Sequence, residues 1–260
     1  MRREIVARLH DNAVILEAQG IEKRFGQVVA LRGASYELRY GEVHAIVGDN
    51  GAGKSTLIKI ISGVHPPDAG TIRLEGREVT IDSPRAAREL GIETVYQDLA
   101  LADALDASSN LFLGRESLLP PPLRWLGFLD KAEMRRRTEE AVRRLKVGIP
   151  SVTQPVINFS GGQRQSIAVA RAIAWGRRIV IMDEPTAALG VRESSMVLEL
   201  IREVRNRGLA IVMVSHNLPE VFLVADRITV LRLGRTIATL KTQDSSVEEV
   251  VAMMTGALAA

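Results

Sequence analysis

Short apolar runs alternate along the chain with stretches in which apolar residues recur at helical spacing, a pattern typical of an α/β protein. The apolar runs predict β-strands over residues 14–18, 34–38, 42–47, 71–74, 79–81, 92–97, 178–183, 209–215, 226–231 and 235–240. The helical spacing predicts helices over residues 56–61, 84–91, 130–146, 164–174 and 246–254. We therefore expect an α/β core in which the closely spaced strand pairs form hairpins.

The strand pattern is interrupted between Asp98 and about Phe159. A loop rich in Pro and Leu is followed there by a charged amphipathic helix. We therefore predict a mainly helical subdomain, residues 98–166, inserted in a domain that spans residues 14–260. Residues 1–13 carry mixed charge without a clear period, so we interpret them as an N-terminal extension.

Two features of the predicted subdomain are open to more than one interpretation. The basic run 135–137 is most simply a solvated helix face rather than a binding patch. The apolar loop before the helix contains Trp125 and Phe128, which makes it a candidate partner surface.

Composition excludes several classes of protein. The 260 residues contain no cysteine, which rules out a disulfide scaffold and thiolate chemistry. The 34 basic and 31 acidic residues are spread along the chain and give a net charge of +3, so nucleic acid is not predicted as a partner. The longest apolar runs are far shorter than the 18 or more residues that span a bilayer, so we expect any membrane role to come through a partner.

One stretch fits the phosphate-binding pattern G-x-x-x-x-G-K-[ST] without a mismatch. It lies between a predicted strand and a predicted helix, as such a loop requires. Glycines allow successive backbone N–H groups to turn toward one anion, the lysine adds a point charge, and the hydroxyl is a ligand for Mg²⁺. The predicted phosphate-binding residues are Gly48, Asp49, Asn50, Gly51, Ala52, Gly53, Lys54, Ser55 and Thr56.

A second candidate anion site opens the helix 164–174, where the sequence is Ser160-Gly161-Gly162-Gln163. Backbone N–H groups and the positive end of the helix dipole favour an anion there. The alternative interpretation, a helix cap in a glycine turn, stays open from these residues alone.

Polar side chains end three predicted strands. At the carboxyl end of a parallel strand they tend to face a ligand crevice. Asp183 is placed to hold Mg²⁺, and Glu184 to orient and deprotonate a water. His216 ends the strand 209–215, where it can contact a γ-phosphate, and Gln97 ends the strand 92–97.

These motifs, in this order, resemble the ATP-binding-cassette (ABC) ATPases over about residues 14–255. The resemblance implies a P-loop NTPase core with an antiparallel β subdomain and an inserted helical subdomain. It also implies ATP and Mg²⁺ as cofactors, with Ser55, Gln97 and Asp183 as metal ligands. By the same resemblance Phe25 stacks on adenine, although on its own it would be interpreted as turn packing.

The resemblance further implies a head-to-tail homodimer, in which Ser160 and Gly162 of one subunit close over the nucleotide held by Lys54 of the other. Closure on ATP and reopening on hydrolysis would drive integral membrane permease subunits. The implied location is peripheral, on the cytoplasmic face of the inner membrane.

Three segments look like the monosaccharide importers of the ribose, xylose and fructose type, namely 94–101, 110–116 and 184–189. The chain has one cassette, so it most resembles their single-cassette branch, and within that branch it looks like the ATPases of fructose importers. A periplasmic sugar-binding protein is then an indirect partner. Alternative functions are a soluble ABC ATPase acting on nucleic acid or ribosomes, and the ATPase of an exporter.

Two residues depart from the common ABC pattern. Phe159 replaces the more usual leucine before Ser160, which is a mild change. Gly190 stands where many members have aspartate, so the usual cross-dimer contact from that loop is in doubt.

Overall fold

The computed structural model of the chain describes residues 13–145, 148–187 and 189–257. They form two compact units. The first contains the described residues up to Gln97, residues 176–185, and those from Ile201 onward. The second contains the described residues of 98–175 and 186–200. The predicted N-terminal extension lies outside the described residues except for Ala13.

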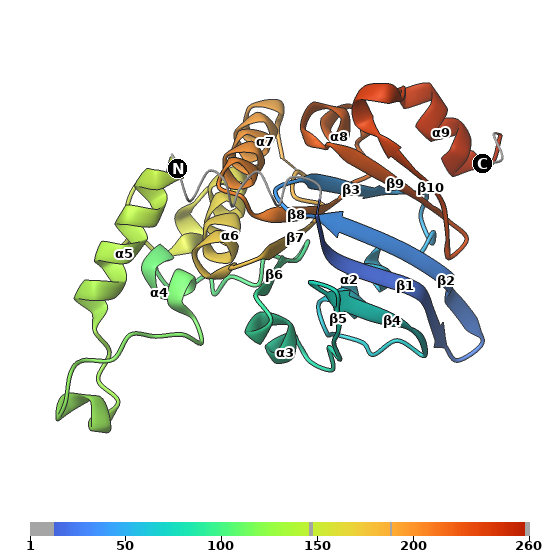
Figure 1. The fold of residues 1–260 in the computed structure, drawn as a ribbon. Helices are drawn as coiled ribbons and strands as arrows, with labels where there is room; N and C mark the ends of the chain where they lie inside the picture. The colour runs from blue at the N-terminus through green and yellow to red at the C-terminus, as the bar shows by residue number, and fades with distance from the viewer. Residues whose placement is uncertain (1–12, 146–147, 188, 258–260) are drawn as a thin grey trace, which may run out of the picture. The chain divides into compact units, whose positions relative to one another are not determined.

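The first unit contains a four-stranded antiparallel sheet of order β2-β1-β4-β5 (Figure 1). Its strands are β1 (Val14–Phe25), β2 (Val28–Arg39), β4 (Ala69–Leu74) and β5 (Arg77–Glu78). β1 and β2 are much longer than predicted because irregular register, including a shift between Ala18 and Ile21, breaks the alternation that marks a strand. The second strand of the predicted hairpin is β5, so the prediction of 79–81 was wrong by two residues.

A six-stranded sheet completes the first unit, in the order β10-β9-β3-β8-β7-β6. All neighbours in it are parallel except β9 and β10, which form the predicted hairpin. The strands are β3 (Val43–Val47), β6 (Ile92–Val95), β7 (Ile179–Asp183), β8 (Ala210–Val214), β9 (Arg227–Arg232) and β10 (Arg235–Lys241).

Four helices of the described residues lie wholly in the first unit: α2 (Lys54–Ile61), α3 (Pro84–Glu89), α8 (Leu218–Val224) and α9 (Val247–Thr255). A short 3₁₀ turn, η3 (Thr242–Asp244), precedes α9. Leu57, Ile58, Ile60 and Ile61 of α2 are fully buried and join both sheets in one hydrophobic core. This core anchors the start of α2, and with it the loop after β3.

The second unit is helical, as predicted. It holds α4 (Ala107–Phe112), α5 (Lys131–Arg144), α6 (Gly161–Trp175) and α7 (Val191–Asn206) as far as Leu200. The 3₁₀ turns η1 (Leu123–Leu126) and η2 (Val156–Asn158) lie between these helices. Its small core contains Ala107, Val156, Phe159 and Ile167, so the aromatic departure at Phe159 fills this core.

The sequence pattern predicted the α/β fold class correctly but missed α4, α7 and α8. It placed the end of the strand 92–97 two residues late, because β6 ends at Val95. The inserted subdomain 98–166 remains a prediction in its boundaries. The compact helical unit runs on through Trp175 and includes the described residues of 186–200.

Candidate functional site

The carboxyl ends of four adjacent parallel strands carry the chemistry-bearing residues. The sheet order β3-β8-β7-β6 makes these strands neighbours. The phosphate-binding loop follows β3, and His216 lies just beyond β8. Asp183 ends β7 with Glu184 directly after it, and Gln97 lies two residues beyond β6. Because parallel strands end at one edge of a sheet, residues far apart in sequence are brought together there.

The loop after β3 packs too tightly for side chains at two of its glycines. A Cβ at Gly48 would lie 2.3 Å from the backbone oxygen of Leu231 in β9. A Cβ at Gly53, whose φ is 106°, would lie 2.7 Å from Leu31 and 2.9 Å from the Ala30 oxygen in β2. The loop is therefore held against β2 and β9 by backbone contacts that only glycine permits.

Lys54 stabilises this loop through hydrogen bonds to its backbone. Its ammonium group donates to the backbone oxygens of Gly48, at 2.8 Å, and of Asp49, at 3.1 Å, and the residue is 9% exposed. Lys54 is also the first residue of α2, whose opening N–H groups have no partner within the helix. Positive charge and free N–H groups therefore lie at the start of the same helix, and the predicted phosphate site there stays a prediction.

Asp183 and Glu184 place two carboxyl groups side by side at the end of β7. Burial, and then the charge of Glu184, raise the pKa of Asp183, while Lys59 and Lys54 oppose the shift. Glu184 has a φ of 51°, a left-handed conformation that costs a non-glycine residue on the order of 1–3 kcal/mol. Strain at a residue carrying a candidate catalytic group is typical of functional sites.

His216 contacts Glu184 across neighbouring strand ends. Its Nδ1 lies 2.9 Å from Glu184 Oε2. The side chain of His216 is 70% exposed, whereas that of Glu184 is 15% exposed. Glu184 is thus oriented from one side by a histidine that still faces solvent. The sequence placed both residues at the site but gave no sign of this contact.

Phe25 ends β1, and its ring is 43% exposed. The His65 ring packs edge-on against it, at 5.2 Å between centroids. The Lys23 ammonium lies 5.7 Å from the Phe25 ring centroid and pairs with Asp68 at 2.7 Å. The sequence did not reveal that His65, Lys23 and Asp68 support Phe25. No local sequence pattern links the strand that carries Phe25 to the turn after α2 that carries His65 and Asp68.

Ser160–Gln163 lies in the second unit and forms a reciprocal cap on α6. The Ser160 N–H donates to Gln163 Oε1 at 3.0 Å, and the Gln163 N–H donates to Ser160 Oγ at 3.3 Å. A Cβ at Gly162 would lie 2.5 Å from Glu193 Cγ in α7, so this glycine is required by packing. The helix-cap interpretation therefore describes the local geometry, while exposed Ser160 and Gly161 keep the helix start open to a ligand.

The predicted Mg²⁺ ligands suit that ion chemically. Ser55, Gln97 and Asp183 offer a hydroxyl, an amide oxygen and a carboxylate, all hard oxygen donors. The raised pKa of Asp183 indicates a carboxylate whose negative charge lacks full compensation, which a bound cation would supply. Mg²⁺ commonly uses one or two carboxylates together with substrate phosphates, so these residues fit the ion.

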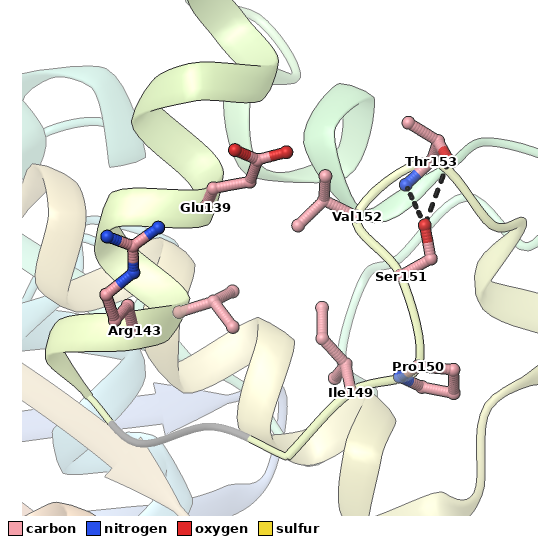
Figure 2. A pocket seen from close by; sticks show the side chains of 8 residues that line it. Glu139, Arg143, Ile149, Pro150, Ser151, Val152 and Thr153 are labelled. Carbon is pink, nitrogen blue, oxygen red and sulfur yellow. Dashed lines mark hydrogen bonds between the residues drawn. The ribbon is translucent and has the colours of Figure 1, made fainter.

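A separate cavity of about 550 Å³ lies in the second unit between α5 and the segment 149–153 (Figure 2). Glu139 and Arg143 line it from α5, and Ser151 Oγ is hydrogen-bonded to Thr153. Both charged residues are exposed, so the cavity offers none of the buried polar anchors of a specific ligand site.

Gly190, the second departure from the ABC pattern, precedes α7. A Cβ there would meet Glu193 Oε2 at 2.6 Å, so the flexible carboxylate of Glu193 fills the space that a side chain at position 190 would take.

Comparisons with known proteins identify the family. A sequence profile of the ABC transporter family matches residues 31–187. Fructose import ATP-binding protein FrcA of Rhizobium meliloti is 53% identical over 245 residues, which cover 94% of each chain. Xylose/arabinose import ATP-binding protein XylG of Sulfolobus acidocaldarius is 47% identical over 93% of this chain and 94% of its own. Ribose import ATP-binding protein RbsA 2 of Rubrobacter xylanophilus is 43% identical, but the match covers 46% of its length.

Solved structures share the fold. An ATP-binding cassette of an ABC transporter, crystallised in its ADP conformation, superposes with a TM-score of 0.78 at 27% identity. The superposition covers 94% of this chain and 96% of that chain. The predicted P-loop NTPase fold of the ABC type is thereby confirmed.

Asp183→Asn distinguishes the effect of Asp183 on folding stability from its predicted effect on metal binding. Because the pKa of Asp183 is raised in the folded state, its ionisation opposes folding as the pH rises through the carboxyl range. Without Mg²⁺ at neutral pH, the variant should therefore unfold at the same temperature as the parent protein or higher. The increase in Tm given by MgATP should be largely lost, as thermal denaturation would show. Asp244→Asn, at an exposed position, is the control, and a full MgATP gain in Asp183→Asn would contradict the assignment.

Phe25→Ala tests the prediction that Phe25 stacks on adenine. Aromatic stacking on a base contributes about 1–3 kcal/mol, so ATP affinity should fall roughly 5- to 150-fold. The affinity for tripolyphosphate should stay unchanged in calorimetric titrations. His65→Ala should act in the same direction but less strongly, because it removes the ring that packs against Phe25. An equal loss for both ligands would mean that Phe25 supports the loop rather than the base.

Proposed function

Since the chain belongs to the ABC transporter family, we propose that it is the ATP-hydrolysing subunit of a monosaccharide importer, with fructose as the first candidate sugar. The observation that carries this proposal is 53% identity to a fructose-import ATP-binding protein over 94% of both chains. The adjacent strand ends of β3, β8, β7 and β6 supply the residues for ATP hydrolysis, and the relatives supply the sugar class.

ATP is held at its phosphates by the loop after β3, where backbone N–H groups and Lys54 face the anion. Ser55, Asp183 and Gln97 would hold Mg²⁺, which neutralises charge on the phosphate oxygens. Glu184 accepts a proton from the attacking water, and His216 orients the Glu184 carboxylate. Phe25 stacks on the adenine, with His65 behind it.

Two copies of the chain would form the working ATPase. The start of α6, with exposed Ser160 and buried Gly162, is a second anion-seeking helix end in the same chain. In the proposed dimer, this helix end lies over the γ-phosphate bound by the partner copy. The two nucleotides would then draw the copies together, and hydrolysis would release them.

Integral membrane subunits would convert this closure into transport, and a periplasmic binding protein would deliver the sugar. Supporting evidence is that FrcA and XylG are both named as import ATP-binding proteins. None of the helices in the described part of the chain combines the length and hydropathy needed to cross a bilayer. We place the chain at the cytoplasmic face of the membrane, bound to those subunits.

Glu184→Gln tests the catalytic assignment. Loss of a general base typically slows the chemical step by about 10²- to 10⁴-fold, so steady-state ATP hydrolysis should fall by that factor. ATP binding should persist and should favour the dimer, measured by light scattering with excess MgATP. The exposed Glu78→Gln is the matched control and should hydrolyse ATP at the parental rate. Robust hydrolysis by Glu184→Gln would show that Glu184 is not the general base.

Reconstitution tests the sugar. The chain and the membrane subunits that co-purify with it would be placed in proteoliposomes with the matching binding protein. Fructose should raise the ATP hydrolysis rate and enter the vesicles, and Glu184→Gln should abolish both effects. Stimulation by xylose or ribose alone would support the proposed importer function but would replace fructose as its sugar. Co-purification of only soluble or ribosomal proteins would overturn the importer.

A further inference from the structure

An exposed hairpin loop connects α4 to α5 in the second unit, and we refer to its residues 117–130 as the tip loop. Two backbone bonds close its neck: Leu119 N–H donates to the Phe128 oxygen at 2.9 Å, and Asp130 N–H donates to the Ser117 oxygen at 2.7 Å. The 3₁₀ turn η1 forms its far end. Figure 1 shows the tip loop extending away from α4, α5 and α6. The nucleotide site described above uses no residue of this loop.

Apolar side chains gather on the tip loop. The side chains of Trp125, Leu126 and Phe128 are 79%, 72% and 53% exposed. Three leucines of the same loop are also exposed, namely Leu118, Leu123 and Leu129. Six large exposed hydrophobic residues within one short hairpin form a patch, whereas isolated ones would need no explanation. Such a patch on a soluble chain marks a binding surface.

Most of the exposed charges around the patch are basic, and the exposed acid beside it, Glu116, accepts the Gly114 N–H at 2.9 Å. Arg124 is the only charged residue from Ser117 to Leu129, and it is exposed beside Trp125. Lys131 and Arg135 follow in the first turns of α5 and are also exposed. The acidic neighbour Asp130 is engaged, because its carboxylate accepts the Glu133 N–H at 2.9 Å and caps α5.

The backbone of the tip loop is largely satisfied from within. Residues 120–122 are prolines and have no N–H group. Trp125 N–H donates to the Pro122 oxygen at 3.1 Å, and Gly127 N–H donates to the Arg124 oxygen at 3.1 Å. Arg124 and Phe128 donate to the oxygens of Pro120 and Leu123, each at 3.4 Å. Each N–H group that is bonded within the loop lowers the cost of entering a region of low dielectric constant.

We propose that the tip loop inserts its apolar side chains into the interfacial layer of an anionic lipid bilayer, with Arg124 on the headgroup phosphates. Trp and Phe favour this layer, and exposed Arg and Lys are attracted by anionic lipid. A protein partner that adds a strand would need an extended edge, whereas the far end of this loop is a 3₁₀ turn. The inference goes beyond the proposed function, in which the chain reaches the membrane only through partner subunits.

Tryptophan fluorescence of the full chain tests the proposal directly. The chain has two tryptophans, and Trp175 packs on Phe112 and donates to the Leu111 oxygen. In a Trp175→Phe background, the emission of Trp125 should shift to the blue with vesicles of phosphatidylcholine and phosphatidylglycerol. Vesicles of phosphatidylcholine alone should give a weaker effect, because they lack the negative charge that attracts Arg124.

Vesicle co-sedimentation measures the contribution of the apolar side chains. The double variant Trp125→Ser, Leu126→Ser should weaken binding to the anionic vesicles by at least about ten-fold, given the apolar area that it removes. Leu223→Ser is the matched control, since Leu223 is 60% exposed on α8, and it should bind as the parent does. Arg124→Glu should remove most of the dependence on phosphatidylglycerol.

Absence of vesicle binding by the parent chain, or equal binding by the double variant, would overturn the proposal. Loss of co-purification with a membrane subunit in detergent, without vesicle binding by the parent, would assign the patch to a protein and also overturn it. ATP hydrolysis is measured on the same samples. Because the tip loop is outside the nucleotide site, a failure here leaves that site in place, and a failed Glu184 test leaves the lipid result in place.

Discussion

The structure depends on the close approach of one loop to the strands on either side of it. Gly48 lies against the Leu231 oxygen in β9, and Gly53 lies against Ala30 and Leu31 in β2. These contacts connect the antiparallel sheet, the parallel sheet and the start of α2. An added methyl group at either glycine would force backbone apart, because interiors packed at this density do not yield locally. The geometry that leaves room for phosphate oxygens is thus the same geometry that joins the two sheets.

Electrostatics adds a second requirement at the end of β7. Asp183 and Glu184 are adjacent carboxyl groups, and burial disfavours the charge of Asp183. In the folded chain, Lys54 and Lys59 favour that charge only in part. A cation bound at Asp183 would therefore be favoured, because it would stabilise the two adjacent negative charges at the end of β7. In the proposed function, stability and metal binding would therefore oppose each other at Asp183, as is common where function needs charge out of water.

Local chemistry explains which parts could be predicted from the sequence. The candidate phosphate-binding loop, the two acids and His216 could be predicted because their residue types and spacing match what a phosphate, a metal ion and a water would require. The long β1 and β2 were not, since the irregular register around Gly20 removes the alternation on which a strand prediction relies. The support of Phe25 by His65 and of Lys23 by Asp68 depends on tertiary folding, so no spacing rule reveals it.

The hydrogen bonds of Lys54 have a further consequence for the kinetics of nucleotide capture. The ammonium group has two carbonyl partners in this loop, which hold the Lys54 side chain in one conformation. In the proposed function, a phosphate would take over donors that are already in position, so little rotamer entropy would be lost on binding. We therefore expect association to be limited by encounter rather than by a slow rearrangement of the loop, with the exchange of acceptors occurring after contact.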